Sequence, residues 1–313
     1  MDFSVAFAEH YFTRGVERGE EGVAKLRKSV GVHGKVHREP DVTSTSGICR
    51  DMLSIARRSN NGSFPQPDRD ARYSALAPVY DGILGDHFFP QIRRIFERLV
   101  RFHGIRFSSV ADVACGTGTF VRYLCARGVP VVYGVDRSPE MLRVAILKNH
   151  GTYARFLIQA FATLRLPHLV DLITCHFDSL NYVLTADDLL RALRRFRVNV
   201  KPTGHVIFDM ITDRPPWHGP GPRVERVTGQ DVTVVRITCW DPRRSIQTAL
   251  VSVGRDGRPQ QEIHVQRGYP VALVAGLLAQ ARFALLGSHD FQTLGPAAAR
   301  TRRVVYVARA RAG

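Results

Sequence analysis

The sequence predicts an α/β fold in which a mostly parallel sheet is interrupted by antiparallel hairpins. Short apolar runs alternate with helical stretches between residues 88 and 211, which is the pattern of β-α-β units. Between about residues 215 and 270 the pattern changes to alternating β-type runs separated by turn residues such as Gly229 and Asp256-Gly257. A helix over about 271–281 and strands near 285 and over 303–307 then resume the first pattern. The hairpins are therefore expected to be an insertion within one domain.

The remaining elements follow in a regular order. Apolar residues spaced three or four apart predict a helix over 88–103, which Gly104 ends. The strands expected next cover 110–114, 131–135, 156–158, 169–175 and 205–211. The helices between them are expected to pass through Phe120 and Leu124, to begin at Ser138-Pro139, and to follow a cap at 185–188. The alternating runs of the insertion are 224–227, 232–239, 245–253 and 261–266.

The N-terminal region is expected to lie outside this core. Residues 5–30 carry a loose helical stripe that several glycines interrupt, which predicts a weak helix. Residues 31–70 are rich in Gly, Ser, Pro, Asn and charge, which is typical of a flexible linker. We therefore expect an N-terminal region over 1–70 and a main domain over 71–313.

The composition is that of a globular protein with a strong positive charge. The chain has 44 Lys and Arg against 28 Asp and Glu, a formal net charge of +16, which raises the question of a nucleic-acid partner. A solvated basic surface is the simpler explanation, so we do not expect nucleic acid. No stretch reaches the roughly 18 uncharged apolar residues of a membrane helix, and the start lacks a signal peptide pattern, so cytoplasmic localisation without membrane contact is expected. The cysteines form no CxxC pair, and no metal site is expected.

A glycine-rich loop follows the first strand of the main domain. Gly116 and Gly118 permit a tight turn and a close approach of the backbone to a ligand. Asp136 ends the second strand, where a carboxylate can accept hydrogen bonds from both hydroxyls of a ribose. Val121 stands where a dinucleotide site has its third glycine, and there is no GxxxxGK[ST] loop. The pattern therefore predicts an adenosine-type ligand that is neither a dinucleotide nor bound by a P-loop.

These motifs resemble those of the class I S-adenosylmethionine-dependent methyltransferases. Residues 112–118 resemble their first motif, 134–136 their second, and 201–204 the turn before their fifth strand. Further segments resemble the bacterial small-molecule branch of the family, namely 73–81, 178–182 and 262–269. The resemblance covers about residues 71–309 and implies a Rossmann-like, seven-stranded, mostly parallel sheet. It also implies an antiparallel β insertion after strand five that covers the acceptor site as a lid.

The resemblance implies S-adenosylmethionine as cofactor. The residues that it places around the cofactor are Tyr73, Tyr80, Ala114, Gly116, Gly118, Asp136, Arg137, Ala160, Phe161 and His176. Phe161 departs from the family, which often has an acidic residue there to accept the adenine amino group. We therefore expect either that backbone groups and stacking hold the adenine, or that the cofactor binds more weakly than usual.

The segment after strand four supplies the candidate catalytic residues, His176 and Asp178. They are two residues apart on a stretch expected to be extended, so they could face the same side and act as general base or amine anchor. The candidate acceptor-binding residues are Asp178, Asn181, Tyr182, His264 and Arg267. A sulfonium methyl is already a strong electrophile, so the reaction mostly requires that the nucleophile be held in position.

The expected function is methyl transfer to a small-molecule metabolite or natural product, with an amine nitrogen preferred to a hydroxyl. One alternative is an RNA or other nucleic-acid methyltransferase, which the charge favours. The segment after strand four, however, is CHFDSLNY and not the [ND]PP[YF] of enzymes that methylate base amino groups. A second alternative is a non-catalytic cofactor-binding protein of the same fold, suggested by Phe161 and by residues 1–70. Nothing in the sequence indicates the oligomeric state.

Overall fold

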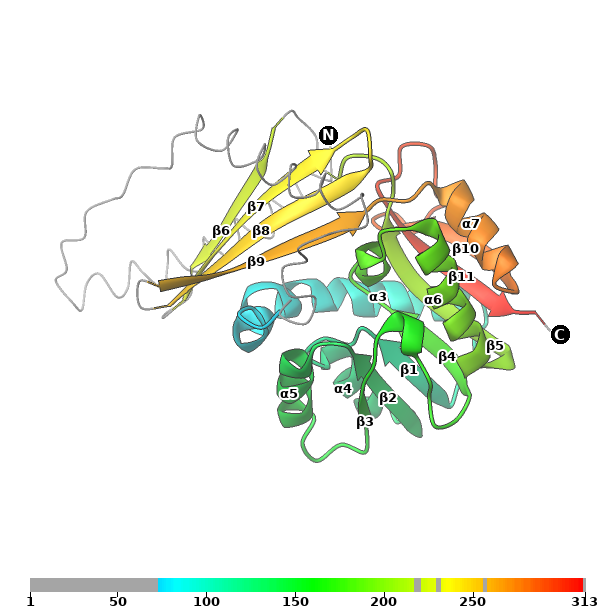
Figure 1. The fold of residues 1–313 in the computed structure, drawn as a ribbon. Coiled ribbons are helices and arrows are strands. Elements are labelled where there is room, and N and C mark those ends of the chain that lie inside the picture. Colours follow the sequence, from blue (N-terminus) through cyan, green and yellow to red (C-terminus); the bar gives the residue numbers. More distant parts are fainter. Residues whose placement is uncertain (1–72, 217–220, 229–231, 256–257, 312–313) are drawn as a thin grey trace.

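The computed structural model describes residues 73–216, 221–228, 232–255 and 258–311, which form two sheets and their flanking helices (Figure 1). The weak helix and linker predicted over residues 1–70 lie outside the described residues. The larger sheet has seven strands in the order β10-β11-β5-β4-β1-β2-β3. Their bounds are β1 Ser109–Val113, β2 Val131–Asp136, β3 Arg155–Ile158, β4 Val170–Cys175, β5 Val200–Ile211, β10 Phe283–Asp290 and β11 Arg303–Ala310.

This sheet is mostly parallel. Strands β3, β2, β1, β4 and β5 pair in parallel, and β11 pairs antiparallel to both of its neighbours. The seven-stranded, mostly parallel sheet that the sequence resemblance implied is therefore confirmed. The chain runs from β1 outward to β3 and then returns to β4 on the other side of β1. Ligands of open α/β sheets bind at the carboxyl ends of the strands beside such a reversal of strand order.

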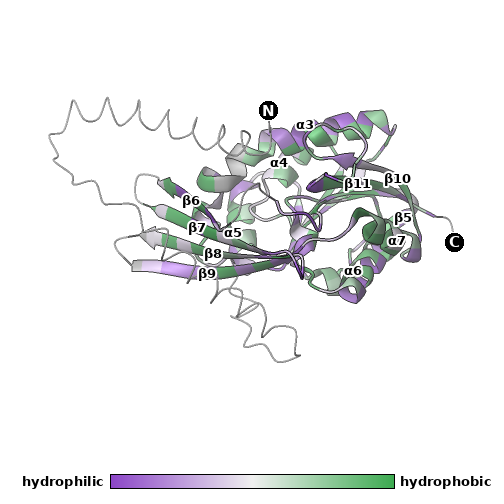
Figure 2. Ribbon diagram, turned by 90° about the horizontal axis from the view of Figure 1, so that it is seen from above, coloured by the Kyte–Doolittle hydropathy of each residue, from purple (hydrophilic) through white to green (hydrophobic). Residues whose placement is uncertain are grey.

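Helices cover both faces of the larger sheet. Helices α3 (Asp86–Phe102), α4 (Thr119–Ala126) and α5 (Pro139–Lys148) bury apolar side chains on one face, and α6 (Ala186–Asn199) and α7 (Val271–Gln280) bury theirs on the other. Figure 2 shows hydrophobic and hydrophilic residues alternating along α3, as an amphipathic surface helix requires. The predicted caps are confirmed, because Ser138 Oγ accepts a hydrogen bond from Met141 N and Thr185 Oγ1 accepts one from Asp188 N.

The insertion is a separate four-stranded sheet. Its strands are β6 (Arg223–Thr228), β7 (Thr233–Asp241), β8 (Ile246–Arg255) and β9 (Arg258–Arg267), all paired antiparallel to their neighbours. They lie between β5 and α7 in the chain, which confirms the expected antiparallel insertion after strand five. The segment that enters the domain, with η2 (Ala77–Val79) and η3 (Asp81–Gly85), packs Leu76 and Ile83 against Val234 and Val251 of this sheet.

One local expectation differs from the structure. Residues 201–204 are predicted as a turn before a strand, whereas β5 already begins at Val200 and pairs with β4 through an irregularity in register. A Cβ on Gly204 would lie 2.8 Å from the Asp171 carbonyl oxygen and 2.5 Å from Val200 Cγ2. The glycine is thus required by close approach of two strands. Among the described helices, none is long and apolar enough to cross a membrane.

Candidate active site

A cavity of about 440 Å³, here called the sheet-edge cavity, opens at the carboxyl ends of β1, β2 and β4. The structure brings nine of the ten predicted cofactor-binding residues to its wall: Tyr73, Tyr80, Ala114, Gly116, Asp136, Arg137, Ala160, Phe161 and His176. Gly118 is the tenth and does not line it. Residues from five separate segments of the chain therefore meet at the edge where the strand order reverses.

The two glycines of the loop after β1 have different roles. Gly116 has a φ of +54°, and a Cβ added to it would meet no atom within 4 Å, so its position faces open space in the cavity. Gly118 has a φ of +73°, and its Cβ would lie 2.7 Å from Asn149 Nδ2 and 3.0 Å from Ala145 Cβ. Gly118 thus allows the loop to pack on α5, whereas Gly116 leaves open space in the wall of the cavity.

Asp136 connects this loop to the start of α5. Its Oδ2 accepts a hydrogen bond from Gly116 N at 2.8 Å, and its Oδ1 accepts one from Ser138 N at 2.9 Å. Burial raises the pKa of the Asp136 carboxyl, and the backbone N–H groups of Ser138 and Gly116 offset part of that effect. Each carboxylate oxygen has a further lone pair, so the group can also accept hydrogen bonds from two vicinal hydroxyls.

Asp112 is a cavity residue that the sequence analysis did not assign to the site. It lies next to the last residue of β1, is 3% exposed, and accepts a hydrogen bond from Thr174 Oγ1 at 2.7 Å. Burial raises the pKa of this carboxyl to about 7. A buried carboxyl of this kind is ionised more easily when a cationic group lies beside it, so Asp112 is suited to bind the cationic part of a ligand. The signal in the sequence was the charged residue within an otherwise apolar strand.

The far wall of the sheet-edge cavity is apolar where Ala160, Phe161 and Ala162 line it, and the neighbouring Gln159 amide is bonded to the backbone of Arg165. Phe161 begins η4 (Phe161–Thr163), and its ring contacts the ring of Phe196 with centroids 6.2 Å apart. The side chain is therefore partly used to pack this loop on α6. The stretch offers no carboxylate, so a flat heterocycle there would meet backbone groups and apolar side chains.

His176 and Asp178 face different cavities, so the expectation that they share one side is wrong. The chain does not continue extended after β4, because Phe177 has a φ of 59° and Asp178 a φ of 47°, both left-handed. His176 lines the sheet-edge cavity, and its ring packs on Phe120 with centroids 4.5 Å apart. Burial lowers the pKa of His176 to about 3, so the imidazole is neutral and a weak base. This environment is unsuited to the general-base role expected of it.

A second cavity of about 160 Å³, here called the insertion cavity, lies between the entering segment and the strands β6 to β9. Four aromatic residues line both cavities and form their common wall: Tyr73, Tyr80, Phe177 and Tyr182. Of the predicted acceptor-binding residues, Asp178, Tyr182 and His264 line the insertion cavity.

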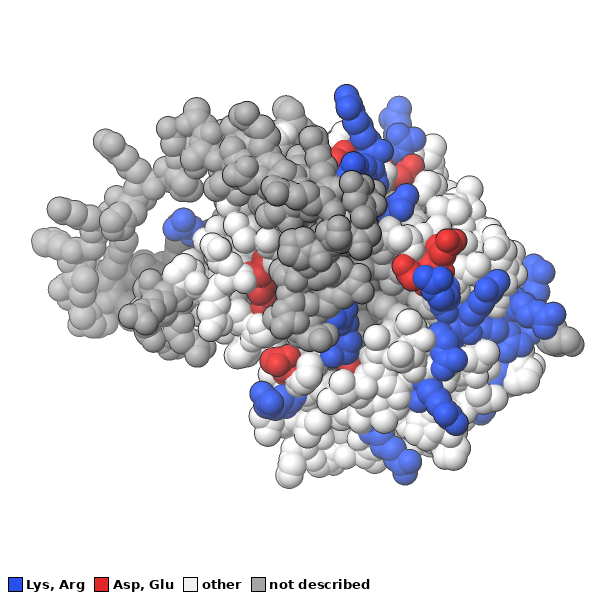
Figure 3. All heavy atoms as spheres, in the orientation of Figure 1, with Lys and Arg blue, Asp and Glu red and all other residues white. Residues whose placement is uncertain are grey.

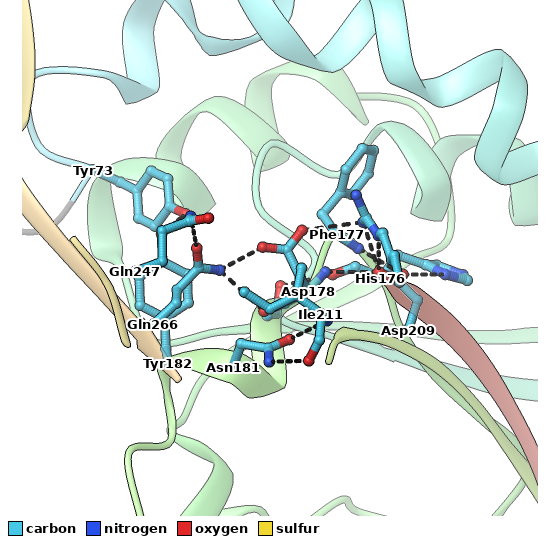
Figure 4. Close-up of polar contacts among 12 residues, drawn as sticks. Tyr73, His176, Phe177, Asp178, Asn181, Tyr182, Asp209, Ile211, Gln247 and Gln266 are labelled. Atoms are coloured by element: carbon cyan, nitrogen blue, oxygen red, sulfur yellow. Dashed lines mark hydrogen bonds and ion pairs between the residues drawn. The ribbon is translucent and has the colours of Figure 1, made fainter. Parts of the chain in front are cut away.

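Asn181 and Arg267, which were also expected to bind the acceptor, line neither of these cavities. Asn181 Nδ2 donates to the carbonyl oxygens of Ile211 and Arg267, and its Oδ1 accepts from Ile211 N (Figure 4). The Arg267 guanidinium donates to the Leu184 carbonyl oxygen and lies 5.5 Å from the Tyr269 ring centroid. Asn181 therefore joins η5 (Ser179–Tyr182) to both sheets, and Arg267 joins β9 to the segment that follows η5, so the polar groups of both side chains are used in holding this junction.

Asp178 lies within a group of charges that the sequence did not reveal. Its Oδ2 accepts a hydrogen bond from Gln266 Nε2 at 2.5 Å, and its Oδ1 lies 3.1 Å from Arg303 Nη2. Arg303 Nε also donates to Asp209 Oδ2 at 2.7 Å, and the Asp209 carboxylate accepts the N–H groups of Phe177 and Asp178. Figure 4 shows Asp178 between Gln266 of the insertion and Asp209 of the larger sheet. Two carboxylates and one guanidinium leave this wall with a net negative charge when both acids are ionised.

Comparisons with known proteins agree with this geometry. Residues 110–204 match a family model described as "Methyltransferase domain". A dTDP-3-amino-3,6-dideoxy-alpha-D-glucopyranose N,N-dimethyltransferase of Streptomyces fradiae is 33% identical over 128 residues, which are 39% of this chain and 44% of that protein. The chain spans about half the length of the curated relatives it matches.

Solved structures show the same fold. An S-adenosylmethionine-dependent methyltransferase from Clostridium acetobutylicum superposes with a TM-score of 0.66 at 24% identity, over 76% of this chain and 99% of that one. The sugar N-methyltransferase KedS8 from Streptoalloteichus superposes with a TM-score of 0.56 at 21% identity, over 90% of this chain and 97% of that one. With the methyltransferase domain matched over residues 110–204, the strand order and the glycine loop beside Asp136, the chain has the fold of the S-adenosylmethionine-dependent methyltransferases.

Proposed function

We propose that the protein transfers the methyl group of S-adenosylmethionine to an amine nitrogen of a small molecule. One observation carries the proposal: the sheet-edge cavity and the insertion cavity meet at a common aromatic wall. A cofactor in the first cavity and an acceptor in the second can thus bring a sulfonium methyl and a nucleophile together at that wall. Because in-line displacement depends mainly on such positioning, the arrangement suits methyl transfer.

The residues of the sheet-edge cavity fit the parts of the cofactor. Gly116 lets the backbone approach the methionine portion, and the Asp112 carboxyl can ionise beside its ammonium group. The Asp136 carboxylate accepts the ribose hydroxyls. The adenine then lies against Arg137 and residues 159–162, held by backbone groups and by stacking.

The insertion cavity favours an amine as acceptor. Its wall carries Asp178 and Glu225 against Arg236 and Arg303, and the Asp209 carboxylate paired with Arg303 adds a third acid, so the group has one excess negative charge when all the acids are ionised. That excess favours an ammonium group, while Leu76, Ile83 and other apolar side chains line the rest. The Streptomyces fradiae relative and KedS8 are both named for N-methylation of sugars, so an amino sugar carried by a nucleotide is the acceptor to test first. In this proposal the strands β6 to β9 act as the lid over the acceptor.

The basic surface gives less support to a nucleic-acid substrate. Figure 3 shows Lys and Arg side chains gathered on the side of the molecule that carries α6 and the C-terminal strands. Of the arginines on α6, Arg191 pairs with Asp188, Arg195 donates to the Leu164 carbonyl oxygen, and Arg197 donates to the Arg311 carbonyl oxygen. These contacts engage the guanidinium groups of the three arginines within the protein, which favours a small-molecule acceptor.

The test compares cofactor binding with transfer. Calorimetry with S-adenosylhomocysteine and with NAD should show binding of the first in preference to the second. Mass spectrometry should then show methylation of dTDP-3-amino-3,6-dideoxy-α-D-glucopyranose and none of the matched sugar nucleotide with a hydroxyl at that carbon. Failure to bind S-adenosylhomocysteine would refute the function, and methylation of the hydroxyl compound alone would refute the amine preference.

A further inference from the structure

The chain bends sharply after β4, and the bend forms part of both cavities. Phe177 and Asp178 both have a left-handed backbone, with φ of 59° and 47°. Neither residue is a glycine, and such conformations persist where the surrounding structure holds them. Phe177 lines both cavities, and Asp178 lines the insertion cavity. The place of the Asp178 carboxylate in that cavity therefore depends on the contacts that hold the bend.

Asp209 on β5 holds the bend. Strand β5 runs parallel to β4 with Phe208 opposite Cys175, so Asp209 lies beside the end of β4. Its Oδ1 accepts the N–H of Phe177 and its Oδ2 accepts the N–H of Asp178, both at 2.9 Å (Figure 4). A carboxylate has one acceptor oxygen for each of these N–H groups, whereas a side-chain amide in its place has a single acceptor oxygen.

Arg303 on β11 lies between Asp209 and Asp178. Its Nε donates to Asp209 Oδ2 at 2.7 Å, and its Nη2 lies 2.6 Å from the same oxygen and 3.1 Å from Asp178 Oδ1. Arg303 and Asp178 line the insertion cavity, whereas Asp209 is 1% exposed and lines neither cavity. Asp209 therefore acts on the insertion cavity through Arg303 and through the bend.

Sharing of the guanidinium leaves negative charge on Asp178. If Arg303 faced Asp178 alone, the two charges would cancel. Because Arg303 also pairs with Asp209, the three groups keep one negative charge when both acids are ionised. The amide of Gln266, which donates to Asp178 Oδ2, is neutral and does not change this balance.

Glu225 is the other acid that lines the insertion cavity. It lies 2.9 Å from Arg223 Nε and 3.7 Å from Arg236 Nη1, so its charge is already compensated. Of the two carboxylates lining this cavity, Asp178 is therefore the one better able to face a cation.

Methyl transfer to an amine creates positive charge on the acceptor nitrogen. An amine that arrives as an ammonium first loses one proton to solvent, which frees its lone pair. The lone pair forms the bond to the methyl carbon, the carbon–sulfur bond breaks with its electron pair going to sulfur, and the positive charge moves from sulfur to nitrogen. A carboxylate beside that nitrogen stabilises both the arriving ammonium and the charge that develops during transfer.

We propose that Asp209 is a positioning residue that makes the site selective for an amine. It holds the bend that places the Asp178 carboxylate in the insertion cavity, and it balances Arg303 so that this carboxylate can pair with a cationic nitrogen. The proposal rests on the proposed function, because it assumes that the acceptor binds in the insertion cavity.

The first experiment tests the bend and needs no acceptor. Hydrogen exchange at the amides of Phe177 and Asp178 is measured by NMR on the full-length protein with bound S-adenosylhomocysteine. In Asp209→Asn at least one of the two amides loses its acceptor, so we expect its exchange to become at least about 10-fold faster. Parental exchange at both amides in a folded Asp209→Asn protein would overturn the proposal.

Asp171→Asn is the matched control for Asp209→Asn. Asp171 also accepts two backbone N–H groups, from Ser108 and Ser109, and pairs with a cation, Lys201, away from both cavities. Its replacement should speed exchange at those two serines and leave the bend after β4 unchanged.

The second experiment measures selectivity in the complex with S-adenosylhomocysteine. Calorimetry gives the Kd of dTDP-3-amino-3,6-dideoxy-α-D-glucopyranose and of the matched sugar nucleotide with a hydroxyl at that carbon. Asp209→Asn should reduce the preference for the amine at least about 10-fold, the loss of one charge-assisted contact, and leave the Kd of the hydroxyl compound nearly unchanged. Asp171→Asn should keep the parental preference. An equal loss for both compounds in Asp209→Asn would indicate a merely structural role and refute the selectivity.

Asp178→Asn tests whether Asp209 acts through Asp178. This variant should lose the preference for the amine, and adding Asp209→Asn to it should cause no further loss. Asp178 is partly exposed, so the single variant also serves if Asp209→Asn does not fold. An amine preference that survives in Asp178→Asn, or that falls again in the double variant, would contradict the proposal.

Methylation by the parent protein separates this inference from the proposed function. If the parent methylates the amine and Asp209→Asn keeps the preference for it, the inference alone fails. If the parent methylates neither compound, the amino-sugar form of the proposed function fails, and the selective role of Asp209 fails with it. The exchange of Phe177 and Asp178 still shows in that case whether Asp209 holds the bend.

Discussion

Replacing Asp136 with alanine removes a carboxylate that serves both the fold and the ligand site. In the free protein the backbone N–H groups of Gly116 and Ser138 lose their acceptor, at 2.8 and 2.9 Å. Hydrogen bonds to a charged group contribute about 1.5–3 kcal/mol each, and release of a buried charge offsets part of this, so we expect a loss of about 2–4 kcal/mol in the free energy of unfolding.

The same change should weaken cofactor binding. Loss of the charge-assisted hydrogen bonds to the ribose hydroxyls should cost about 1.5–3 kcal/mol, which corresponds to a Kd roughly 10-fold to 150-fold higher. Calorimetry with S-adenosylhomocysteine measures this change, and urea unfolding measures the stability of the same preparations.

Asp171→Ala is the matched control for Asp136→Ala. Asp171 Oδ2 also accepts two backbone N–H groups, from Ser108 at 2.9 Å and Ser109 at 3.0 Å, and the carboxylate pairs with Lys201. It lies at the start of β4, on the edge of the sheet opposite the sheet-edge cavity. Its loss should lower stability and leave the Kd unchanged. A folded Asp136→Ala protein with the parental Kd would refute the ribose assignment.

Three further predictions concern the same cavity. Burial raises the pKa of Asp112 to about 7 in the folded protein. Between about pH 4 and pH 7 the unfolded chain therefore ionises this group while the folded protein keeps it protonated, so the free energy of unfolding falls as the pH rises. Asp112→Asn should therefore raise the free energy of unfolding more at pH 8 than at pH 4, and it should weaken S-adenosylhomocysteine binding. An equal change in stability at both pH values would contradict the raised pKa of Asp112. Gly118→Ala should lower stability by about 1–3 kcal/mol because its Cβ would overlap Asn149 and Ala145. Gly116→Ala is strained only by its φ of +54°, so it should lower stability less and weaken cofactor binding more, and the reverse pattern would refute the two roles. Because the pKa of His176 is about 3, His176→Gln should change cofactor affinity without moving the pH optimum of methyl transfer, and a moved optimum would restore His176 as the base.

The sheet-edge cavity was largely predictable because its signals are local. Gly116 and Asp136 lie at the ends of consecutive strands, and the parallel pairing of β1 with β2 brings these ends together. The β-α-β pattern therefore already fixes their neighbourhood. Gly118 does not line the cavity and packs against α5, which the sequence could not indicate, because a ligand and a packed helix both call for glycine.

The acceptor side was less predictable for a different reason. An alternation argument placed His176 and Asp178 on one face, but Phe177 and Asp178 adopt left-handed conformations that their residue types do not signal. Asp209 and Arg303, which hold the chain there, lie far from it in sequence.

Hydrophobic periodicity and the spacing of glycine and aspartate determined the α/β fold and the class of ligand, because strand pairing and helix packing follow from patterns within a few residues. Only the tertiary structure decided which polar groups meet in the insertion cavity. Tyr182 comes from η5 and Glu262 and His264 from β9, and their side chains meet because the packing of η5 on the insertion buries these polar groups together, where each must find a hydrogen-bond partner.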